Sequence, residues 1–447
     1  MKNNYAILIA EVTVSPKQKP KSKYGVNACL GALENMQEEN YPDVYWAEPA
    51  ESLSDLAHRI APKYERLIVL WSLYSTEFVR ACEQLDEFRQ NTTDLACEIV
   101  HIAGGVHATA EPELTARKGF DFVAVGEGEH TTRMIIDTLN SQRDLCTVQG
   151  LCWMDSGTFR HSQGIPVDNL DQFPTFALRQ GRIGPIEITR GCIYACRFCQ
   201  TPFMFKARFR HRSIVSILQH VEWQISLPRP MTDVRFITPS SLSYGAIGKE
   251  PDLEQVEQLL KSIRHMLPEN GRIFFGSFPS EVRPEHATVD ALSLIVRYAD
   301  NDNVIIGAQS GSDSVLLDSH RGHDVESVIR AVENCRLVGL KANVDFIFGM
   351  PHETKQDVMA SIKLAEKLTR LGAKIHAHTF LPLPGTPWSH EAPGVISDDV
   401  RAMLEKLHQR GTAYGDWQAQ EAQAQEIAAF ESYSNRRKAE RNKKYPV

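Results

Sequence analysis

Hydrophobic and polar positions alternate with two different periods along most of the chain. In the first 150 residues, short apolar runs bounded by turn residues predict five strands. These runs are Tyr5–Ala10, Val44–Trp46, Arg66–Trp71, Glu98–Ala103 and Phe120–Val125. Apolar residues recur at helical spacing in Gly25–Gln37, Leu53–Lys63, Thr76–Asn91 and Pro112–Lys118. The alternation predicts an α/β domain over residues 1–150, a doubly wound, Rossmann-like parallel sheet that binds ligands outside the carboxyl ends of its strands.

A second series of strand and helix patterns follows a stretch that is rich in turn residues. Residues 151–180 have few long apolar runs, so we expect a linker there. Six further strands are predicted at Ile186–Thr189, Asp233–Ile237, Arg272–Ser277, Val304–Ala308, Asn343–Ile347 and Lys374–Thr379. Helices are expected at Ile214–Ile225, Leu253–Met266, Ala287–Tyr298, Val325–Val338 and Lys355–Leu371. The pattern predicts a second α/β domain over residues 181–392 and a helical extension over 393–447.

Composition is that of an ordinary globular protein. A chain of 447 residues with 42% hydrophobic residues can bury a sizeable core and form several domains. The formal net charge of −7 gives no argument for nucleic-acid binding. The apolar run Tyr5–Ala10 is too short for a signal peptide, and no segment is long enough to span a bilayer. We therefore expect a cytoplasmic protein without a membrane span.

Nine cysteines, an odd number, do not suggest a disulfide framework. Three of them, Cys192, Cys196 and Cys199, are spaced as C-x3-C-x2-C behind a short β-branched segment. Soft thiolate ligands on one tight loop suit an iron–sulfur cluster. A structural zinc ion usually takes four ligands, and no fourth Cys or His lies at matching spacing. The other six are expected as buried thiols: Cys29, Cys82, Cys97, Cys146, Cys152 and Cys335.

The cysteine loop, with Phe198 in the aromatic place, resembles that of the radical S-adenosylmethionine (SAM) enzymes. The resemblance implies that the three cysteines hold a [4Fe–4S] cluster, whose open iron chelates the amino and carboxylate groups of SAM. It also implies that the six strand–helix units form a partial (β/α)6 barrel with its chemistry at the carboxyl ends of the strands.

Further motifs at the predicted strand ends are similar to the SAM contacts of that family. Gln309-Ser310 with Arg321 looks like its Q-S-G…R-G stretch, and Gly349 opens a G-x-P-x-E-T turn in which Glu353 is expected to cap the next helix. Phe380 and Leu381 follow the sixth strand, where the family's backbone reads the adenine edge. Glu281 and Arg283 follow the third strand; they either bind the carboxylate and the ribose or amine of SAM, or form a surface ion pair.

One departure concerns the turn after the second strand. The family's Gly-Gly-Glu, which often holds the SAM amine, is replaced by Thr238-Pro239-Ser240-Ser241. The hydroxyls of Ser240 and Ser241 can accept a hydrogen bond from an ammonium, with less charge complementarity. The amine-binding group is therefore left open.

Glycine-rich strand ends in the first domain resemble the amino-terminal cobalamin-binding domain of many radical SAM enzymes. Glycines there let the backbone approach a ligand, and the G-x-G-x-x-G of the competing nicotinamide-binding fold is absent. The implied cobalamin contacts are Ser72, Tyr74, Gly104, Gly105, Val106, His107, Gly126, Glu127, Gly128 and Glu129. The D-x-H-x-x-G motif that supplies a histidine to cobalt is missing, and Asp318-Ser-His320 comes nearest, in the other domain. The lower axial ligand is open; His107 is expected to line the corrin amides or, less simply, to bind cobalt.

Other polar groups have open interpretations. His376 and His378 lie two apart on the sixth strand and so share one face. They are candidates for acid–base groups, for hydrogen bonds to a corrin propionamide, or for a packed pair. The lysine-rich segment 15–23 is expected as a solvated loop, or as a cover for an anionic group. The basic tail 436–444 is expected as a solvated helix end, or as an RNA contact.

The resemblance implies reductive cleavage of SAM to a 5′-deoxyadenosyl radical and, with methylcobalamin, C-methylation of an unactivated carbon. Ring closure or rearrangement without methyl transfer is the alternative. Methylthio transfer is less well supported, because neither a second three-cysteine set nor an appended RNA-binding β-domain is present. A cobalamin-binding sensor or carrier and a zinc-stabilised protein are the non-catalytic alternatives. Expected partners are a small-molecule, lipid or peptide substrate and an electron donor such as flavodoxin or ferredoxin.

Overall fold

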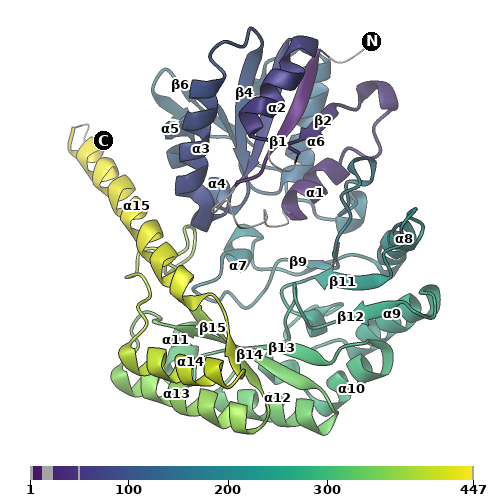
Figure 1. Cartoon of the computed structure of the whole chain (residues 1–447), viewed down its shortest axis with the longest axis vertical. Helices are drawn as coiled ribbons and strands as arrows, with labels where there is room; N and C mark the ends of the chain where they lie inside the picture. Colours follow the sequence, from purple (N-terminus) through teal and green to yellow (C-terminus); the bar gives the residue numbers. More distant parts are fainter. Residues whose placement is uncertain (1–3, 13–23, 49–50, 445–447) are drawn as a thin grey trace. The chain divides into compact units, whose positions relative to one another are not determined.

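The computed structural model of the chain describes residues 4–12, 24–48 and 51–444, with side chains as far as residue 430. It divides into two compact units, residues 1–184 and 185–447 (Figure 1). The lysine-rich segment 15–23 and the side chains of the basic tail 436–444 lie outside the described residues. The interpretations given for them therefore stay predictions.

The first unit contains a seven-stranded sheet in the order β2-β1-β3-β4-β5-β6-β7. Its strands are β1 (Tyr5–Ala10), β2 (Asp43–Trp46), β3 (Arg66–Ser72), β4 (Glu98–Gly104), β5 (Phe122–Ala124), β6 (Leu151–Asp155) and β7 (Thr158–Arg160). The first five pair in parallel, as predicted, and β6 and β7 add an antiparallel edge. The strand order reverses between β1 and β3, and this switch point is where such a sheet binds ligands.

The segment expected as a linker differs from the prediction. Residues 151–160 are β6, a turn at Gly157 and β7, and the first unit extends to Gly184. The sequence signal was weak because an edge hairpin alternates polar and apolar residues over only a few positions. Cys152 at the start of β6 is fully buried, which shows that the hairpin belongs to the sheet.

Helices cover both faces of this sheet. They are α1 (Tyr24–Gly31), α2 (Leu53–Ile60), α3 (Phe78–Asn91), α4 (Val106–Ala110), α5 (Pro112–Arg117) and α6 (Gly128–Asn140). Tyr5, Ile7 and Ile9 of β1 pack on one face with Leu33 after α1 and Ile136 of α6. Every residue of β1 is buried, because a central strand with helices on both sides has no polar face.

The second unit contains the predicted barrel strands. They are β8 (Ile186–Glu187), β9 (Thr189–Arg190), β10 (Arg210–His211), β11 (Asp233–Ile237), β12 (Arg272–Phe274), β13 (Asn303–Gln309), β14 (Lys341–Phe348), β15 (Lys374–Thr379) and β16 (Ala413–Tyr414). Parallel pairing gives the orders β8-β11-β12 and β13-β14-β15-β16. Backbone hydrogen bonds from Ile305 to Gly276 (2.8 Å) and from Val282 to Ile305 (2.7 Å) join the two sheets. The six predicted strands and the added β16 thus form one open, curved wall of parallel strands, which confirms the predicted partial barrel.

The helices of this unit start where side chains satisfy their first amides. They are α7 (Gln200–Met204), α8 (Ile214–Ile225), α9 (Leu253–Met266), α10 (Val289–Tyr298), α11 (Asp313–Asp318), α12 (Val325–Leu337), α13 (Lys355–Arg370), α14 (Asp398–Gln409) and α15 (Trp417–Lys444). Ser213, Asp252, Thr288 and Asp324 accept a hydrogen bond from the third residue beyond them and so cap α8, α9, α10 and α12. The predicted and observed bounds of these helices agree closely, because the capping residue stands where the helical spacing of apolar residues begins.

The strands of the wall have one face under the helices and one face toward the lumen. In β14, Ala342, Val344, Phe346 and Phe348 are buried, whereas Asn343, Asp345 and Ile347 are half-buried. The same alternation leaves His376 and His378 of β15 half-buried on the lumen face. The carboxyl-terminal extension is helical as expected, with one addition: β16 pairs in parallel with β15.

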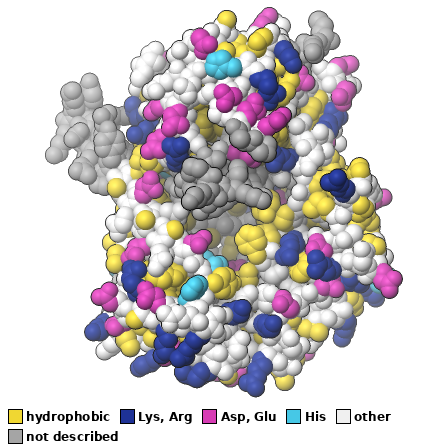
Figure 2. Space-filling model, viewed as in Figure 1, with side chains coloured by type: hydrophobic (Ala, Val, Ile, Leu, Met, Phe, Trp, Pro, Cys, Tyr) yellow, Lys and Arg dark blue, Asp and Glu magenta, His cyan; other side chains and the backbone are white. Residues whose placement is uncertain are grey.

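The six cysteines outside the three-cysteine loop differ in burial. Cys152 and Cys335 are buried as predicted, but Cys29, Cys82, Cys97 and Cys146 are only partly buried. No helix in the described part of the chain combines the length and the apolar composition that crossing a membrane requires. On the face shown in Figure 2, acidic and basic side chains are interspersed.

Candidate active site

The three-cysteine loop runs from β9 to α7 at the carboxyl end of the first barrel strand. Gly191 precedes it with φ +81°, and a Cβ there would lie 2.1 Å from the carbonyl oxygen of Arg208. Only glycine permits both that conformation and that close approach. Ala195 has φ +51°, which turns the loop back between Cys192 and Cys196. The loop is therefore shaped by its backbone and held against β10.

The three thiols lie in surroundings that disfavour free thiolates. Cys196 is 4% exposed, and Cys192 and Cys199 are partly buried. Burial raises the pKa of Cys192 and, with the neighbouring Cys196 as a second cause, raises the pKa of Cys199 to about 11. Without a bound cation these two thiols would stay protonated near neutral pH. Metal ligation would supply the positive charge that keeps them ionised.

The separation of the thiols does not suit a single zinc ion. Zinc–sulfur bonds of about 2.3 Å place tetrahedral sulfurs roughly 3.8 Å apart. Among the described residues, one group has three possible ligand atoms from His, Cys, Asp or Glu within 4.8 Å of one another. It consists of Asp345, His376 and His378. The three cysteine sulfurs are therefore more widely spaced, as a cluster that binds each sulfur to a different iron allows.

Arg321 links the cysteine loop to the barrel wall. Its Nη1 lies 3.7 Å from Cys196 Sγ, and its Nη2 donates to the carbonyl oxygen of Gly307 at 2.5 Å. Glu281 lies 4.0 Å from the same guanidinium. Burial raises the pKa of Glu281, and Arg321 opposes that shift. Gly307 is required here, because a Cβ would lie within 3.0 Å of Arg321, Gln309 and Glu281. A buried charged pair thus adjoins the cluster loop.

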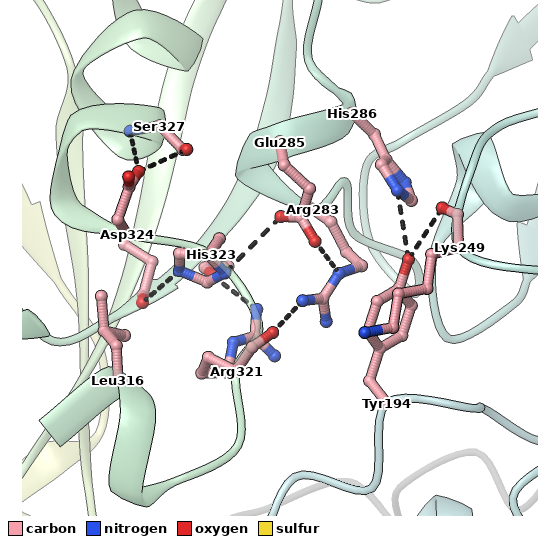
Figure 3. Close-up of polar contacts among 12 residues, drawn as sticks. Tyr194, Lys249, Arg283, Glu285, His286, Leu316, Arg321, His323, Asp324 and Ser327 are labelled. Atoms are coloured by element: carbon pink, nitrogen blue, oxygen red, sulfur yellow. Dashed lines mark hydrogen bonds and ion pairs between the residues drawn. The ribbon is translucent and has the colours of Figure 1, made fainter.

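Arg283 has a different partner from the one predicted. Its Nε pairs with Glu285 at 2.5 Å, and its Nη2 donates to the carbonyl oxygen of Arg321 (Figure 3). The guanidinium stacks 3.4 Å from the centre of the Tyr194 ring. Its side chain is only 3% exposed. The surface ion pair with Glu281 is corrected, because Arg283 is buried and pairs with Glu285; the binding of a carboxylate by Arg283 stays a prediction.

The residues around Arg283 form a polar layer that sequence reasoning missed. Tyr194 Oη lies 3.1 Å from His286 Nε2, and donates to the carbonyl oxygen of Lys249 at 3.1 Å. His323 Nε2 lies 3.2 Å from the carbonyl oxygen of Ala308, and its Nδ1 lies 3.5 Å from Glu285 (Figure 3). Tyr194 lies inside the cysteine motif and His323 two residues after Arg321. The sequence could have pointed to Tyr194 and His323 through their proximity to these motifs. Nothing in the sequence pointed to Glu285 and His286.

Serines fill the place of the family's Gly-Gly-Glu turn. Ser241 Oγ accepts from the amide of Gly276 at 3.0 Å and contacts Ser280 Oγ. Ser240 is 2% exposed, and its hydroxyl has no hydrogen-bond partner among the described residues; the same holds for Ser277. Buried hydroxyls without partners are costly, so a bound polar group is the natural partner for Ser240 and Ser277.

Two strand-end residues expected to bind SAM have structural roles instead. The Ser310 hydroxyl accepts from the amide of Ser312 (3.2 Å) and lies 3.3 Å from Ser361 Oγ of α13. The amide of Phe380 donates to Phe348 (2.9 Å), and its carbonyl accepts from Gly394 (3.2 Å). The backbone of Phe380 is therefore not free to read an adenine edge. Leu381, partly buried, remains a candidate.

The turn after β14 also differs from expectation. Gly349 has φ +73°, and a Cβ would lie 2.7 Å from the amide nitrogen of Val395, so its role is to admit that segment. Thr354 caps α13 through a capping box with Asp357. Glu353 precedes the cap, and its carboxylate accepts from the amide of Met350 at 2.9 Å. The expectation that Glu353 caps the helix is corrected.

Phe198 and Gln309 lie where the sequence placed them, at the mouth of the barrel. Phe198 packs against Trp388, with ring centres 6.5 Å apart, beside Met350 and Phe380. Gln309 ends β13 with φ +74°, at a shift in the strand register. Trp388 was missed, because it follows the last predicted strand by nine residues and carries no motif of its own.

In the first unit, the predicted cobalamin contacts divide into exposed and buried residues. Tyr74 is 37% exposed, and Gly105 and Gly126 are exposed after β4 and β5. Gly126 has φ +82°, and a Cβ there would lie 3.9 Å from the Cα of Gly164, an ordinary contact distance. Ser72, Gly104, Val106 and Gly128 are partly buried beside them. These residues follow β3, β4 and β5, and so border the carboxyl end of the sheet.

Three of the predicted cobalamin residues have a structural role. His107 is 3% exposed, stacks on Phe78 with ring centres 3.8 Å apart, and contacts Ser75 Oγ at 3.2 Å. Burial lowers the pKa of His107 to about 3. Glu127 is buried and accepts from the amide of Val167 at 3.2 Å, and Glu129 is buried in α6. The ring of His107 packs on Phe78, and its buried Nε2 has no hydrogen-bond partner among the described residues, so its role toward a corrin stays a prediction.

The glycines at these strand ends also have packing reasons. A Cβ on Gly105 would lie 2.9 Å from the backbone of Leu73, and one on Gly128 would lie 2.4 Å from Cys29 Sγ of α1. The sequence attributed both glycines to a ligand. Of the four, Gly105 and Gly126 have a positive φ, and of these two Gly126 is the one where a Cβ would lie no closer than 3.9 Å to another atom.

Comparison with known proteins agrees with this geometry. Residues 186–365 match the sequence model of the radical SAM superfamily. The chain is 27% identical over 303 residues to an uncharacterized methyltransferase of Pyrococcus horikoshii, covering 64% of this chain and 61% of that protein. It is 28% identical over 261 residues to the tRNA-2-methylthio-N(6)-dimethylallyladenosine synthase of Magnetococcus marinus, covering 57% of each. The chain thus spans less than two thirds of the length of these relatives.

A solved structure extends the likeness to both units. The radical SAM methyltransferase TsrM of Kitasatospora setae, solved with cobalamin and a [4Fe-4S] cluster bound, matches with a TM-score of 0.65 and 19% identity. The match covers 88% of this chain and 78% of that one. At this identity the likeness shows the fold, including the amino-terminal sheet that precedes the barrel. Residues 186–365 therefore match the radical SAM superfamily, and the chain as a whole shares the fold of the TsrM structure.

Proposed function

We propose that this protein is a cobalamin-dependent radical SAM enzyme that transfers a methyl group to a carbon of its substrate. One observation carries the proposal. The three-cysteine loop of a radical SAM domain adjoins a buried, ionisable pair, Arg321 and Glu281, at the carboxyl ends of the barrel strands. A buried charged pair beside an iron–sulfur loop is costly unless it serves a ligand.

The residues at the cysteine loop fit a [4Fe–4S] cluster. The spacing of the thiols excludes a shared zinc ion, and burial keeps Cys192 and Cys199 from ionising without a bound cation. When bound, the cluster supplies one-electron reduction of SAM. The Arg321 guanidinium, 3.7 Å from Cys196 Sγ, would donate to that sulfur and fix its orientation.

The polar groups at the strand ends fit the two charged ends of SAM. Glu281 offers a carboxylate for the ammonium group, and the hydroxyls of Ser240 and Ser277 offer hydrogen bonds that no described residue uses. Arg321 donates to Gly307 and faces Glu281, which leaves its Nε, buried and without a partner among the described residues, for a carboxylate. Glu281 is thus our candidate for the role of the missing Gly-Gly-Glu glutamate.

The carboxyl edge of the first sheet fits a corrin ring in its shape and chemistry. Gly105 and Gly126 offer exposed backbone after β4 and β5, and the partly exposed Tyr74 follows β3, next to the β1/β3 switch point. Bound cobalamin would supply the methyl group. Among the described loop residues at this edge, no histidine is exposed, because His107 is buried. We therefore propose that the protein binds the corrin without histidine ligation.

The proposal extends to the class of the substrate and the class of the electron donor. Radical SAM chemistry needs a reductant, and a flavodoxin or ferredoxin is the class we propose. The half-buried lumen face of β14 and β15, with Asp345, His376 and His378, is the proposed substrate contact. Because that face carries ionisable groups, the substrate has a polar or ionisable group of its own.

Anaerobic reconstitution tests the proposal. Wild-type protein with iron, sulfide, methylcobalamin, SAM and a reductant is expected to form 5′-deoxyadenosine or S-adenosylhomocysteine. Cys196→Ala is expected to lose the brown cluster absorbance and all SAM turnover, whereas Cys97→Ala, a partly buried thiol of the first unit, is expected to retain both. Wild-type protein that binds iron and sulfide and yet turns over no SAM would contradict the proposal.

The nature of the product separates methyl transfer from its alternatives. With S-[methyl-²H₃]SAM and a deproteinised extract of the host cell, a labelled methyl group in one extract component supports methylation. An unlabelled product favours ring closure or rearrangement, and a product with added sulfur favours methylthio transfer. Corrinoid binding with no SAM turnover at all indicates a sensor or carrier.

A further inference from the structure

His376 belongs to a row of polar residues that crosses the lumen face of the barrel wall. Strand pairing places Gly307, Asp345, His376 and Tyr414 side by side on β13, β14, β15 and β16. Arg321 and Glu281 lie over Gly307, within 3.0 Å of where its Cβ would be. The row therefore leads from the charged pair at the cysteine loop directly to Asp345 and His376.

Asp345 and His376 form a close pair. Asp345 Oδ1 lies 2.9 Å from His376 Nδ1, and His378 Nε2 lies 3.2 Å from the same nitrogen. The ring of Tyr414 stacks parallel to that of His376, with an interplanar angle of 8° and centres 4.4 Å apart. The side chains of His376 and Asp345 are 27% and 15% exposed, so the pair is accessible from the lumen.

Gln420 of α15 determines the tautomer of His378. The Gln420 Oε1 accepts from the amide of Thr379 at 2.9 Å, so its Nε2 is the atom that faces His378 Nδ1 at 3.2 Å. An amide nitrogen only donates, and His378 Nδ1 must therefore be the acceptor. His378 is neutral and carries its proton on Nε2, in line with the burial that lowers its pKa.

The proton of His376 follows from this arrangement. A carboxylate only accepts hydrogen bonds, so Asp345 Oδ1 at 2.9 Å draws a proton to His376 Nδ1. The Nε2–H of His378 is a second donor close to the same carboxylate, since all three atoms lie within 4.8 Å of one another. His376 Nε2 is left with a lone pair, and it has no hydrogen-bond partner among the described residues. The geometry is that of a histidine base oriented by a carboxylate.

The same three atoms could be taken for a metal site, but Gln420 argues against it. A metal ion bound through His378 Nε2 would require the proton on Nδ1. That proton would face Gln420 Nε2, which is itself a donor. Rotating the Gln420 amide would instead turn two donors toward each other at Thr379. Protons leave one such pair of facing donors as well, at His376 Nδ1 and His378 Nε2, so the zinc content of the purified protein decides between a metal ion and protons.

We infer that His376 is the proton acceptor of the substrate reaction, oriented by Asp345 and neighboured by the neutral His378. In the step, the proton of a substrate N–H, O–H or activated C–H bond moves to His376 Nε2. The electron pair of that bond stays on the substrate, and the imidazolium is stabilised by the Asp345 carboxylate. The proton then leaves to water through the lumen. This inference rests on the proposed function, and it adds that the substrate carries a weakly acidic hydrogen.

Chemical rescue tests the role of His376. The assay measures transfer of label from S-[methyl-²H₃]SAM to the product in deproteinised host extract. His376→Ala is expected to lower the rate by about 10²-fold or more. Added imidazole is expected to restore it at least tenfold. His265→Gln, on the exposed surface of α9, is the matched control and should keep the wild-type rate. Iron and sulfide contents equal to wild type show that each variant is folded.

Two further measurements separate proton transfer from a structural role. The charged and titratable groups facing His376 are Asp345, His378 and Tyr414, with Arg321 and Glu281 further along the row. When His376→Ala is rescued with a series of substituted imidazoles, the acid limb of the rescued rate is expected to follow the pKa of the added base. Asp345→Asn should lower the turnover rate and leave the KM for SAM unchanged. His376→Gln serves in place of alanine if the alanine variant does not fold.

Each outcome decides the inference. Rescue by imidazole, with an acid limb that follows the pKa of the added base, supports it. A variant with the wild-type rate, or one whose loss neither imidazole nor pH alters, overturns it. So does stoichiometric zinc in wild-type protein that disappears in His376→Ala, because the cluster is then a metal site. If wild-type protein labels no extract component, the proposed function itself fails, and the inference with it.

Discussion

Single residues at the candidate site combine packing with charge. Arg321 is 4% exposed, yet its guanidinium contacts a cysteine sulfur, a backbone carbonyl and the side of a glutamate. The fork geometry of arginine allows these contacts at once, which a lysine could not reproduce. Arg283, also buried, donates a hydrogen bond to the carbonyl oxygen of Arg321 and so supports that residue. The two arginines thus have different roles: Arg321 faces the proposed ligand site, and Arg283 positions Arg321.

Glu353 gives a prediction at the same scale. Burial raises the pKa of its carboxyl group to about 7, from an ordinary value of 4.5, although the Met350 amide opposes the shift. Between these two pH values the folded chain binds a proton that the unfolded chain has lost. Stability therefore falls as pH rises from 4.5 to 7 and is level above that range. The contribution is at most about 3 kcal/mol, from about 1.4 kcal/mol per pKa unit.

Glu353→Gln removes the titration and can still accept from the Met350 amide. We expect the variant to gain stability relative to wild type by about 1–3 kcal/mol when pH is raised from 5 to 8. Thermal unfolding of both proteins, loaded with the cluster at the two pH values, measures the gain. A difference between the two proteins that is independent of pH would mean that the carboxyl group titrates normally.

At the scale of elements, short loops between β-strands and helices place the site. The cysteine loop is held against β10 because Gly191 lets it approach the carbonyl oxygen of Arg208. The turn after β14 is held in the same way, since Gly349 admits the backbone of Val395. Glycines in these positions set the distance between neighbouring loops, whatever ligand is bound.

Gly191→Ala tests that view. A Cβ 2.1 Å from a backbone oxygen forces the loop away from β10, in addition to the cost of a positive φ. We expect the iron and sulfide bound per chain to fall by half or more after reconstitution. Gly339→Ala is the matched control, because Gly339 also has a positive φ, +85°, but open space around its Cβ position.

The control variant should lose about 1 kcal/mol of stability or less and keep full iron content. Equal iron contents in Gly191→Ala and Gly339→Ala would show that close packing against β10 does not hold the loop. Iron and acid-labile sulfide assays on anaerobically prepared protein provide the measurement.

At the scale of the whole molecule, the two cofactors are proposed for different units. The cysteine loop lies in residues 185–447, and the proposed corrin contacts lie in residues 1–184. Each group of residues is built on its own sheet and its own core, so neither depends on contacts made by the other cofactor. The chain can therefore be expected to bind each cofactor separately.

Removing one cofactor tests this independence. Cys196→Ala should lose the cluster and still bind hydroxocobalamin with an affinity within about threefold of wild type, a difference of less than 1 kcal/mol. Conversely, protein prepared without corrinoid should reconstitute a full complement of iron and sulfide. Gly126→Leu, which adds a large side chain at a proposed contact, should weaken corrinoid binding and leave the iron content unchanged.

Corrinoid binding is measured by equilibrium dialysis and visible absorbance. Loss of cobalamin binding in Cys196→Ala would contradict independence and place cluster and corrin in one cooperative unit. Unchanged binding by Gly126→Leu would remove this edge of the sheet as the corrin site.

The sequence by itself determined the order and class of the elements. Apolar period, caps and turns are local properties, and for that reason the bounds of α8, α9, β11 and β15 agree with prediction to the residue. It also determined the cysteine loop, since three ligands on one short segment need no tertiary information to be recognised.

Only the tertiary structure decided the partners of the side chains. The pairing of Arg283 with Glu285, the burial of His107 and the place of β6 and β7 depend on which segments pack together. Asp345 and His376 are 31 residues apart and meet because parallel strands put them in register. Periodicity shows which face a side chain occupies; strand register and helix packing determine what it touches there, and those are long-range properties of the fold.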